Sequence, residues 1–197
     1  MMTNFDNYMG VRLMIEFLNG NCDLLNRHDK NSILFNEDLF IYSVSKIAED
    51  IKKNFDMSKK IGLVGIARGA LPLLVAVSHE LGIRNVNVFQ VVMSKSDTEF
   101  DFDKVAKIYD GYVDKSCDCY IIFEDIVSRG RSVNVMLEEF LKEKLEVSAV
   151  YSLFVKEDFI ESGKLLGDTD LRYVFPFKSD EWVYFFWEKK YKILKNL

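Results

Sequence analysis

The sequence predicts an α/β protein in which helices flank a mostly parallel sheet. Short apolar runs of strand length alternate with segments of helical periodicity, as expected when helices connect parallel strands. The chain has 197 residues, which suits one domain with its own core. Polar loops that contain glycine follow two of the apolar runs, after Ile66 and after Phe123. Ligands of parallel sheets bind at the carboxyl ends of strands, so these two loops are the candidate binding sites.

The first 35 residues carry the weakest pattern. A helix that ends at Gly20-Asn21 would place six apolar side chains on one face: Met9, Val11, Met14, Ile15, Phe17 and Leu18. We therefore assign residues 1–35 to an N-terminal helical extension or hood. Residues 36–197 form the main domain in this division.

A helix from Asn36 to about Phe55 opens the part of the chain with a clear pattern. Asn36 is its expected N-cap, and Glu37 and Asp38 follow in the first turn, where negative charge suits the helix dipole. Apolar residues then recur at helical spacing. The segment is therefore expected to be an amphipathic helix.

A buried strand, a helix and a second strand are expected next. Residues 61–66 form a short apolar run, and residues 71–81 form an apolar helix. Pro72 is tolerated in the first turn, because its missing N–H has no helical partner there. Gly82 fits the C-terminal cap, and residues 86–92 have the composition of a strand.

The second half of the chain continues the alternation. Ser94 to Lys115 is polar and predicts a mobile loop and a hairpin. The amphipathic segment 132–144 predicts a helix. Apolar runs predict four further strands, at 119–123, 147–154, 171–175 and 182–186.

Composition and charge argue against several classes of function. The net charge is -5 and the pI about 5.2, so no basic excess draws the protein to nucleic acid or to anionic membranes. No apolar run reaches about 18 residues, and no basic segment leads into an apolar one at the N-terminus, so neither a membrane span nor a secretory signal is expected. Three cysteines without a disulfide or zinc pattern favour the reducing cytoplasm.

The loop after Phe123 has the composition of a binding site. Glu124 and Asp125 directly follow an apolar strand, and burying two ionised carboxylates would cost several kcal/mol each. We therefore expect both at the sheet edge, where they accept hydrogen bonds from sugar hydroxyls or hold Mg²⁺. Ser128 to Ser132 then opens a helix, whose free N–H groups suit phosphate. The alternative is a plain strand end followed by a capped helix.

This segment resembles the motif with which type I phosphoribosyltransferases bind 5-phosphoribosyl-1-pyrophosphate (PRPP). The resemblance implies that Glu124 and Asp125 meet the ribose hydroxyls, with Asp125 near Mg²⁺. It implies that the next loop cradles the 5′-phosphate through Ser128, Arg129, Gly130, Arg131 and Ser132. The implied catalytic residues are Glu124, Asp125 and Ser128. Purine enzymes of the family usually carry Asp in place of Ser128, and a serine cannot replace that carboxylate as a general base.

The loop after Ile66 resembles the pyrophosphate loop of the same family. Arg68 and Gly69 stand in the matching places, and arginine beside backbone N–H groups suits pyrophosphate. The resemblance implies a cis peptide bond between Ala67 and Arg68. Many members have a second glycine where this chain has Ala70. Taken without the resemblance, this loop is better explained as a structural turn.

The C-terminal part resembles the xanthine-guanine branch of the family. The resemblance implies that Lys156 donates to the exocyclic oxygen of the base and that Trp182 stacks on the purine. Val183 would offer its backbone to the base edge, and Glu188 would lie near the 2-position. Phe186 replaces the usual proline. The alternatives are a solvated surface lysine and a buried aromatic edge strand.

The resemblance, which covers residues 36–188, implies a type I phosphoribosyltransferase fold with a small hood of C-terminal and N-terminal segments. The implied activity is Mg²⁺-dependent transfer of the phosphoribosyl group from PRPP to a 6-oxopurine (guanine, xanthine or hypoxanthine) in purine salvage, by a homodimer or homotetramer. Residues 94–103 stand where the family has a loop that closes over the reaction centre. One alternative is a PRPP- or nucleotide-binding regulatory protein with little or no turnover. The other is an unrelated α/β protein whose acidic pair does not face the 128–132 loop.

Overall fold

The computed structural model describes residues 15–18, 25–29, 31–93, 106–167 and 169–188. Its main feature is a seven-stranded sheet in the order β1-β9-β8-β7-β4-β5-β6. All neighbouring strands are parallel except β5 and β6, which form an antiparallel pair at one edge. The predicted α/β class with a mostly parallel sheet is confirmed. The strands are β1 (Ile15–Phe17), β4 (Ile61–Ala67), β5 (Val86–Met93), β6 (Ala106–Gly111), β7 (Cys119–Val127), β8 (Val147–Lys156) and β9 (Asp170–Phe177).

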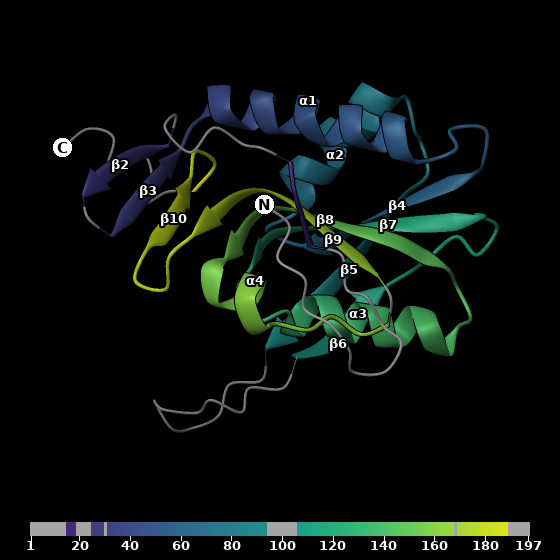
Figure 1. The fold of residues 1–197 in the computed structure, drawn as a ribbon. Helices are drawn as coiled ribbons and strands as arrows, with labels where there is room; N and C mark the ends of the chain where they lie inside the picture. Colours follow the sequence, from purple (N-terminus) through teal and green to yellow (C-terminus); the bar gives the residue numbers. More distant parts are fainter. Residues whose placement is uncertain (1–14, 19–24, 30, 94–105, 168, 189–197) are drawn as a thin grey trace.

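Helices cover both faces of this sheet. Figure 1 shows α1 and α2 on one side and α3 on the other. The predicted caps are confirmed, since Asn36 Oδ1 accepts a hydrogen bond of 2.9 Å from the Leu39 N–H, and Gly82 has a φ of 68°. No helix in the described part of the chain is long and apolar enough to cross a membrane. The helices are α1 (Glu37–Asn54), α2 (Leu71–Leu81), α3 (Arg131–Lys142) and α4 (Glu157–Ser162).

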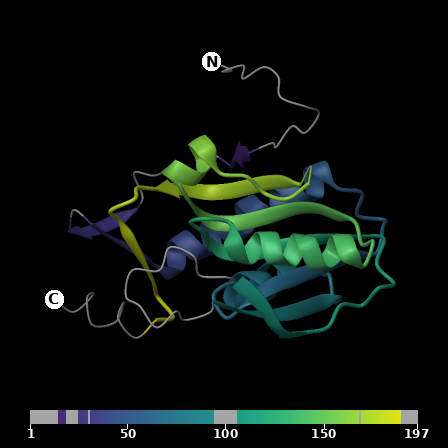
Figure 2. The ribbon, with the colours of Figure 1, turned by 90° about the horizontal axis from the view of Figure 1, so that it is seen from below.

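A second sheet of three strands forms the hood. Its order is β10-β3-β2, with β10 parallel and β2 antiparallel to β3. The strands are β2 (Asn26–Asp29), β3 (Ser32–Phe35) and β10 (Trp182–Phe185). The hood thus joins segments from early and late in the sequence, as predicted, and Figure 2 shows it beside the main sheet.

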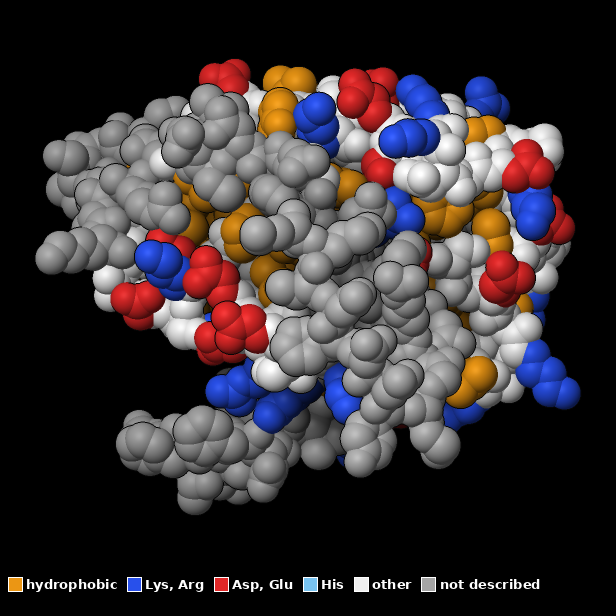
Figure 3. Space-filling model, in the orientation of Figure 1, with side chains coloured by type: hydrophobic (Ala, Val, Ile, Leu, Met, Phe, Trp, Pro, Cys, Tyr) orange, Lys and Arg blue, Asp and Glu red, His pale blue; other side chains and the backbone are white. Residues whose placement is uncertain are grey.

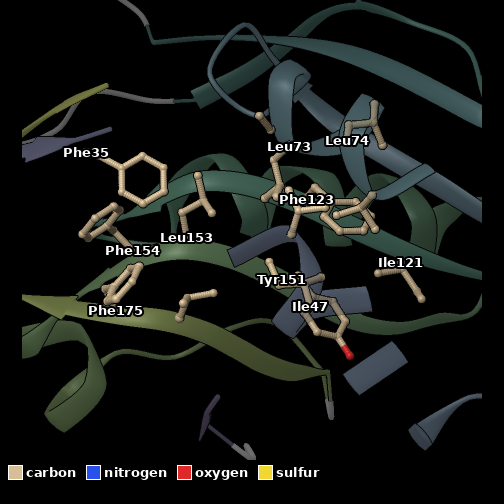
Figure 4. Packing of buried hydrophobic residues seen from close by; sticks show 14 of the residues in the cluster. Phe35, Ile47, Leu73, Leu74, Ile121, Phe123, Tyr151, Leu153, Phe154 and Phe175 are labelled. Carbon is tan, nitrogen blue, oxygen red and sulfur yellow. The ribbon is translucent and has the colours of Figure 1, made fainter. Parts of the chain in front are cut away.

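A cluster of aromatic rings attaches the hood to the main sheet. Phe35 of β3 packs edge-on against Phe154 of β8, with ring centroids 5.3 Å apart, and it also contacts Phe175 of β9 and Phe185 of β10. Figure 4 shows Phe35, Phe154 and Phe175 together. Phe35 and Phe154 have no exposed surface. The carboxyl ends of β8 and β9 therefore lie against the hood.

A buried ionic network lies between α1 and the sheet. Asp50 Oδ2 lies 2.9 Å from an Arg172 guanidinium nitrogen and accepts a hydrogen bond from the Tyr151 hydroxyl. The second guanidinium nitrogen of Arg172 lies 3.4 Å from Asp170. The side chains of Arg172 and Asp50 are only 7% and 13% exposed, so removal of one partner would leave the other charge buried.

Several expectations for individual segments need correction. The helix expected to include Ile15 and Phe17 is wrong there, because these residues form β1 and pair with β9. Residues 9–14 and 19–24, and the loop expected at 94–103, lie outside the described residues. Strands β2 and β3 and helix α4 were not anticipated, and β7 continues four residues beyond Phe123. The division of the chain at residue 35 stays a prediction.

Candidate functional site

Three loops meet at one edge of the main sheet. Strands β8, β7 and β4 are neighbours and run parallel, so their carboxyl ends lie side by side. The loop after β4 carries Arg68 and Gly69, the end of β7 carries the acidic pair, and β8 ends at Lys156. Most of the residues proposed from the sequence for PRPP and base binding are therefore brought to one place.

Glu124 is buried, contrary to the expectation of an exposed carboxylate at the sheet edge. It lies within β7, and only 6% of its surface is exposed. The Ser132 hydroxyl donates a hydrogen bond of 2.8 Å to Glu124 Oε2. Glu124 therefore contacts the 128–132 loop, which argues against the unrelated α/β alternative.

Burial disfavours the ionised form of the Glu124 carboxyl group. Burial raises the pKa of Glu124 well above its ordinary value of 4.5, and the neighbouring Asp125 carboxylate raises it further. The hydrogen bond from Ser132 acts in the opposite direction, because it stabilises the ionised form. A cationic or hydroxyl-rich ligand at this edge would favour the ionised form in the same way.

Asp125 is half-buried and touches the loop after β4. A methyl group in place of the Gly69 hydrogen would lie 2.0 Å from Asp125 Oδ2, far inside van der Waals contact. Only glycine at position 69 leaves room for the carboxylate where it lies. The peptide bond between Ala67 and Arg68 is cis, as the resemblance implied, and the Arg68 side chain is exposed. The acidic pair and the expected pyrophosphate loop are thus in direct contact.

The site fits a magnesium ion that arrives with its ligand. Among the residues described, no group of three or more Asp, Glu, His or Cys side chains could hold a metal by itself. Mg²⁺ is, however, commonly bound by one or two carboxylates together with substrate phosphates and water. The half-buried Asp125 suits that role, and Glu124 lies next to it in β7.

The 128–132 loop, expected from the resemblance to bind the 5′-phosphate, leads directly into α3. Gly130 is the N-cap residue, with a left-handed φ of 65° that favours glycine. A methyl group at Gly130 would lie 2.7 Å from the Phe159 ring of α4. The resemblance placed Gly130 among the residues that cradle the 5′-phosphate, but its φ and the contact with Phe159 already require a glycine here. The N–H groups that open α3 remain suited to an anion.

A cavity of about 260 Å³ lies beside this loop. It brings Ser128 together with Lys156, as the proposed base site requires. The lining also includes Asp158, which the sequence analysis did not identify. The only indication in the sequence was that this carboxylate lies two residues after Lys156. The cavity is lined by Ser128, Arg129, Lys156, Asp158, Phe159, Ser162 and Gly163. In Figure 3, acidic side chains gather where Figure 1 draws α4, with basic side chains just below them.

The remaining residues proposed for the base lie in the hood, outside the lining of this cavity. Trp182 is 65% exposed on the edge strand β10, whereas Val183 is buried and pairs with Ile33 of β3. Glu188 closes the turn after β10, because its carboxylate accepts a hydrogen bond of 3.2 Å from the Phe185 N–H. The roles proposed for Trp182, Val183 and Glu188 stay predictions.

Solved structures share this arrangement of strands and helices. A purine phosphoribosyltransferase from Pyrococcus horikoshii has a TM-score of 0.61 and 21% identity, over 81% of this chain and 95% of that one. Xanthine-guanine-hypoxanthine phosphoribosyltransferase from Helicobacter pylori has a TM-score of 0.62 and 20% identity, over 83% and 99%. A hypothetical protein from Neisseria gonorrhoeae with bound ppGpp has a TM-score of 0.68 and 16% identity, over 87% and 97%.

These comparisons define the class of fold. Neither a protein-family model nor a curated protein sequence matches the chain. The structural matches to purine and 6-oxopurine phosphoribosyltransferases nevertheless cover most of it. The protein has the type I phosphoribosyltransferase fold, which its sequence motifs predicted.

Proposed function

We propose that the protein transfers the 5-phosphoribosyl group of PRPP to N9 of a 6-oxopurine and releases pyrophosphate. The observation that carries this proposal is the contact between Gly69 and Asp125. It joins the loop expected to bind pyrophosphate to the carboxylate expected to face the ribose, at the edge of the sheet where such folds bind ligands.

The proposed reaction is a substitution at C1 of the ribose. The bond from C1 to N9 of the base forms while the bond from C1 to the pyrophosphate oxygen breaks, and the electron pair leaves with pyrophosphate. Arg68 and the backbone beside it would stabilise the charge on the leaving group. Mg²⁺ bound with PRPP near Asp125 would neutralise phosphate charge. The rest of the catalysis would come from holding base and ribose in line.

Ser128 determines how fast this reaction can run. The family's purine enzymes usually have a carboxylate here to accept the base proton, and a serine hydroxyl is a poor base at neutral pH. In the proposed reaction the proton passes to solvent or to a neighbouring group, so turnover is slow. Proton transfer by a positioned side chain typically contributes 10²- to 10⁴-fold. We expect Ser128→Asp to raise kcat with guanine or hypoxanthine by at least about tenfold.

A steady-state assay tests the proposal directly. The full chain is supplied with PRPP, Mg²⁺ and, one at a time, guanine, xanthine, hypoxanthine, adenine, uracil or orotate. Formation of a 6-oxopurine nucleotide and pyrophosphate in equal amounts supports the proposal. If no base yields a nucleotide, with wild type or with Ser128→Asp, the protein is not a phosphoribosyltransferase.

A second candidate is a nucleotide-binding regulatory protein on the same fold. Two observations favour it: Ser128 replaces the usual carboxylate, and one structural relative has been solved with bound ppGpp. This candidate predicts binding without turnover. Calorimetry with PRPP, GMP and ppGpp distinguishes the two, because micromolar binding together with an inactive Ser128→Asp variant supports regulation. The absence of heat with all three ligands excludes it.

A further inference from the structure

Helix α4 connects three parts of the candidate site. Phe159 packs against Gly130 of the phosphate loop. Asp158 lies 3.6 Å from the Lys156 ammonium group and accepts a hydrogen bond from the Ser179 hydroxyl, in the segment that leads to β10. A six-residue helix thus holds the phosphate loop, the end of β8 and the base of the hood in fixed relation.

The Lys156 ammonium group needs such a partner. Its side chain is 20% exposed, and it lines the same cavity as Ser128 and Arg129. A lysine has a flexible four-carbon stem, and a lone ammonium group near the phosphate loop would be drawn to any phosphate. The Asp158 side chain is 66% exposed, but the Ser179 hydroxyl holds its carboxylate 3.6 Å from the ammonium group, where it offsets that charge and draws Lys156 toward α4. The hydrogen bond from Ser179, followed by the charge of Lys156, lowers the pKa of Asp158, which keeps it ionised.

We propose that Asp158 is a positioning residue that sets the preference for 6-oxopurines over 6-aminopurines by holding Lys156 in the base cavity. The inference rests on the proposed function and deepens it. An ammonium group can only donate hydrogen bonds. It therefore binds a 6-oxo group, which is an acceptor, and disfavours a 6-amino group, which is a donor. This discrimination requires that the ammonium group cannot turn away. Sites that hydrogen-bond a substrate in this way reject analogues strongly, since a mismatched buried polar group is left unpaired.

The experiment compares Asp158→Ala and Asp158→Asn with wild type, using guanine and adenine at saturating PRPP. We expect kcat/KM for guanine to fall about two- to fivefold in both variants, because each loses an ion pair with Lys156 in which Asp158 is largely exposed to solvent. In a second series with PRPP varied at saturating guanine, the KM for PRPP should stay within about twofold of wild type. Glu161→Ala is the matched control, since Glu161 is an exposed carboxylate on the same helix that does not line the cavity.

A double-mutant cycle separates positioning from a general loss of structure. If Asp158 acts through Lys156, Asp158→Ala has no further effect on guanine selectivity in a Lys156→Met background. If the losses of guanine selectivity in the two single variants multiply in the double variant, the inference is overturned. So does an unchanged guanine-to-adenine ratio in Asp158→Ala, or an equal loss for both bases and PRPP.

The inference can fail separately from the proposed function. If wild type binds nucleotides without turnover, the same variants are compared by the Kd of GMP and of AMP. A wild type that binds GMP and AMP equally overturns the inference alone. A wild type that binds neither PRPP nor GMP overturns the proposed function and the inference together.

Discussion

Gly69→Ala should separate ligand binding from stability. The added methyl group would lie 2.0 Å from Asp125 Oδ2 and 2.3 Å from Asp125 Cγ. An ordinary carbon–oxygen contact is more than about 3 Å, so the carboxylate must retreat by roughly 1 Å. It is the end of a half-buried side chain and can move at little cost to the fold. Gly69 does not have a left-handed φ, so alanine introduces no backbone strain at this position.

The displacement sets the expected magnitude. A misplacement of about 1 Å at a reacting centre can cost about 10²-fold. We therefore expect kcat/KM for PRPP to fall about 100-fold in Gly69→Ala, which corresponds to about 2.7 kcal/mol. The Tm should change by no more than about 4 °C, since side-chain adjustment costs about 1 kcal/mol in a chain of this size. Calorimetric binding of PRPP with Mg²⁺ measures the same loss if turnover is absent.

Gly82→Ala is the matched control. A methyl group at Gly82 meets nothing within 4 Å, but the φ of 68° is unfavourable for alanine. This variant should lose about 1–2 kcal/mol of stability and keep PRPP binding. If Gly69→Ala binds PRPP as wild type does, Asp125 is not the carboxylate that faces the ribose. If both variants lose binding in proportion to their stability, the contact between Gly69 and Asp125 has no special role.

Three further changes test other parts of the structure. Burial raises the pKa of Glu124, so the folded protein keeps a proton that the unfolded chain releases near pH 4.5. The free energy of unfolding therefore falls as pH rises above about 4.5, until Glu124 also ionises in the folded protein. Glu124→Gln should remove this fall, and its Tm measured in EDTA at pH 8 should exceed that of wild type; parallel Tm–pH curves would contradict this. Asp50→Asn should lower the free energy of unfolding, measured in urea, by about 3–5 kcal/mol, because it leaves Arg172 buried without its main counter-charge. Asp170→Asn should cost clearly less, because Asp170 lies farther from Arg172. Trp182→Ala should weaken GMP binding by about 5- to 150-fold, the value of one stacked base, and leave PRPP binding unchanged; an unchanged GMP affinity would remove Trp182 from the base site.

The sequence was sufficient where local rules determine structure. Asn36 and Gly82 were recognised because helix caps depend on one side chain or one φ angle. The strands 61–66 and 119–123 were recognised because buried parallel strands are continuous apolar runs. Strands β2 and β3 have four residues each and α4 has six, which is too short for a periodic pattern to be visible.

The errors at the candidate site arose from tertiary contacts. The exposure expected for Glu124 followed from the cost of burying a charge, but burial raises the pKa of Glu124 and so favours its neutral form, and the Ser132 hydroxyl donates a hydrogen bond to it. The resemblance placed Gly130 in the loop for the 5′-phosphate, and the sequence does not show that Phe159, 29 positions later, packs against this glycine. Asp158 was missed for a similar reason, since its partner Ser179 lies in a distant segment.

The parallel pairing of β10 with β3 has a consequence for the order of folding. Strand β3 comprises residues 32–35 and β10 comprises residues 182–185, so most of the chain must be made before they can meet. Contacts between such distant segments form late, because a long loop must close before they contribute. Strands β4 and β7, which lead into the two loops of the candidate site, can pair earlier, since they are closer in sequence. On the ribosome, a chain growing at about 5–20 residues per second would therefore assemble this edge of the candidate site several seconds before the hood is complete.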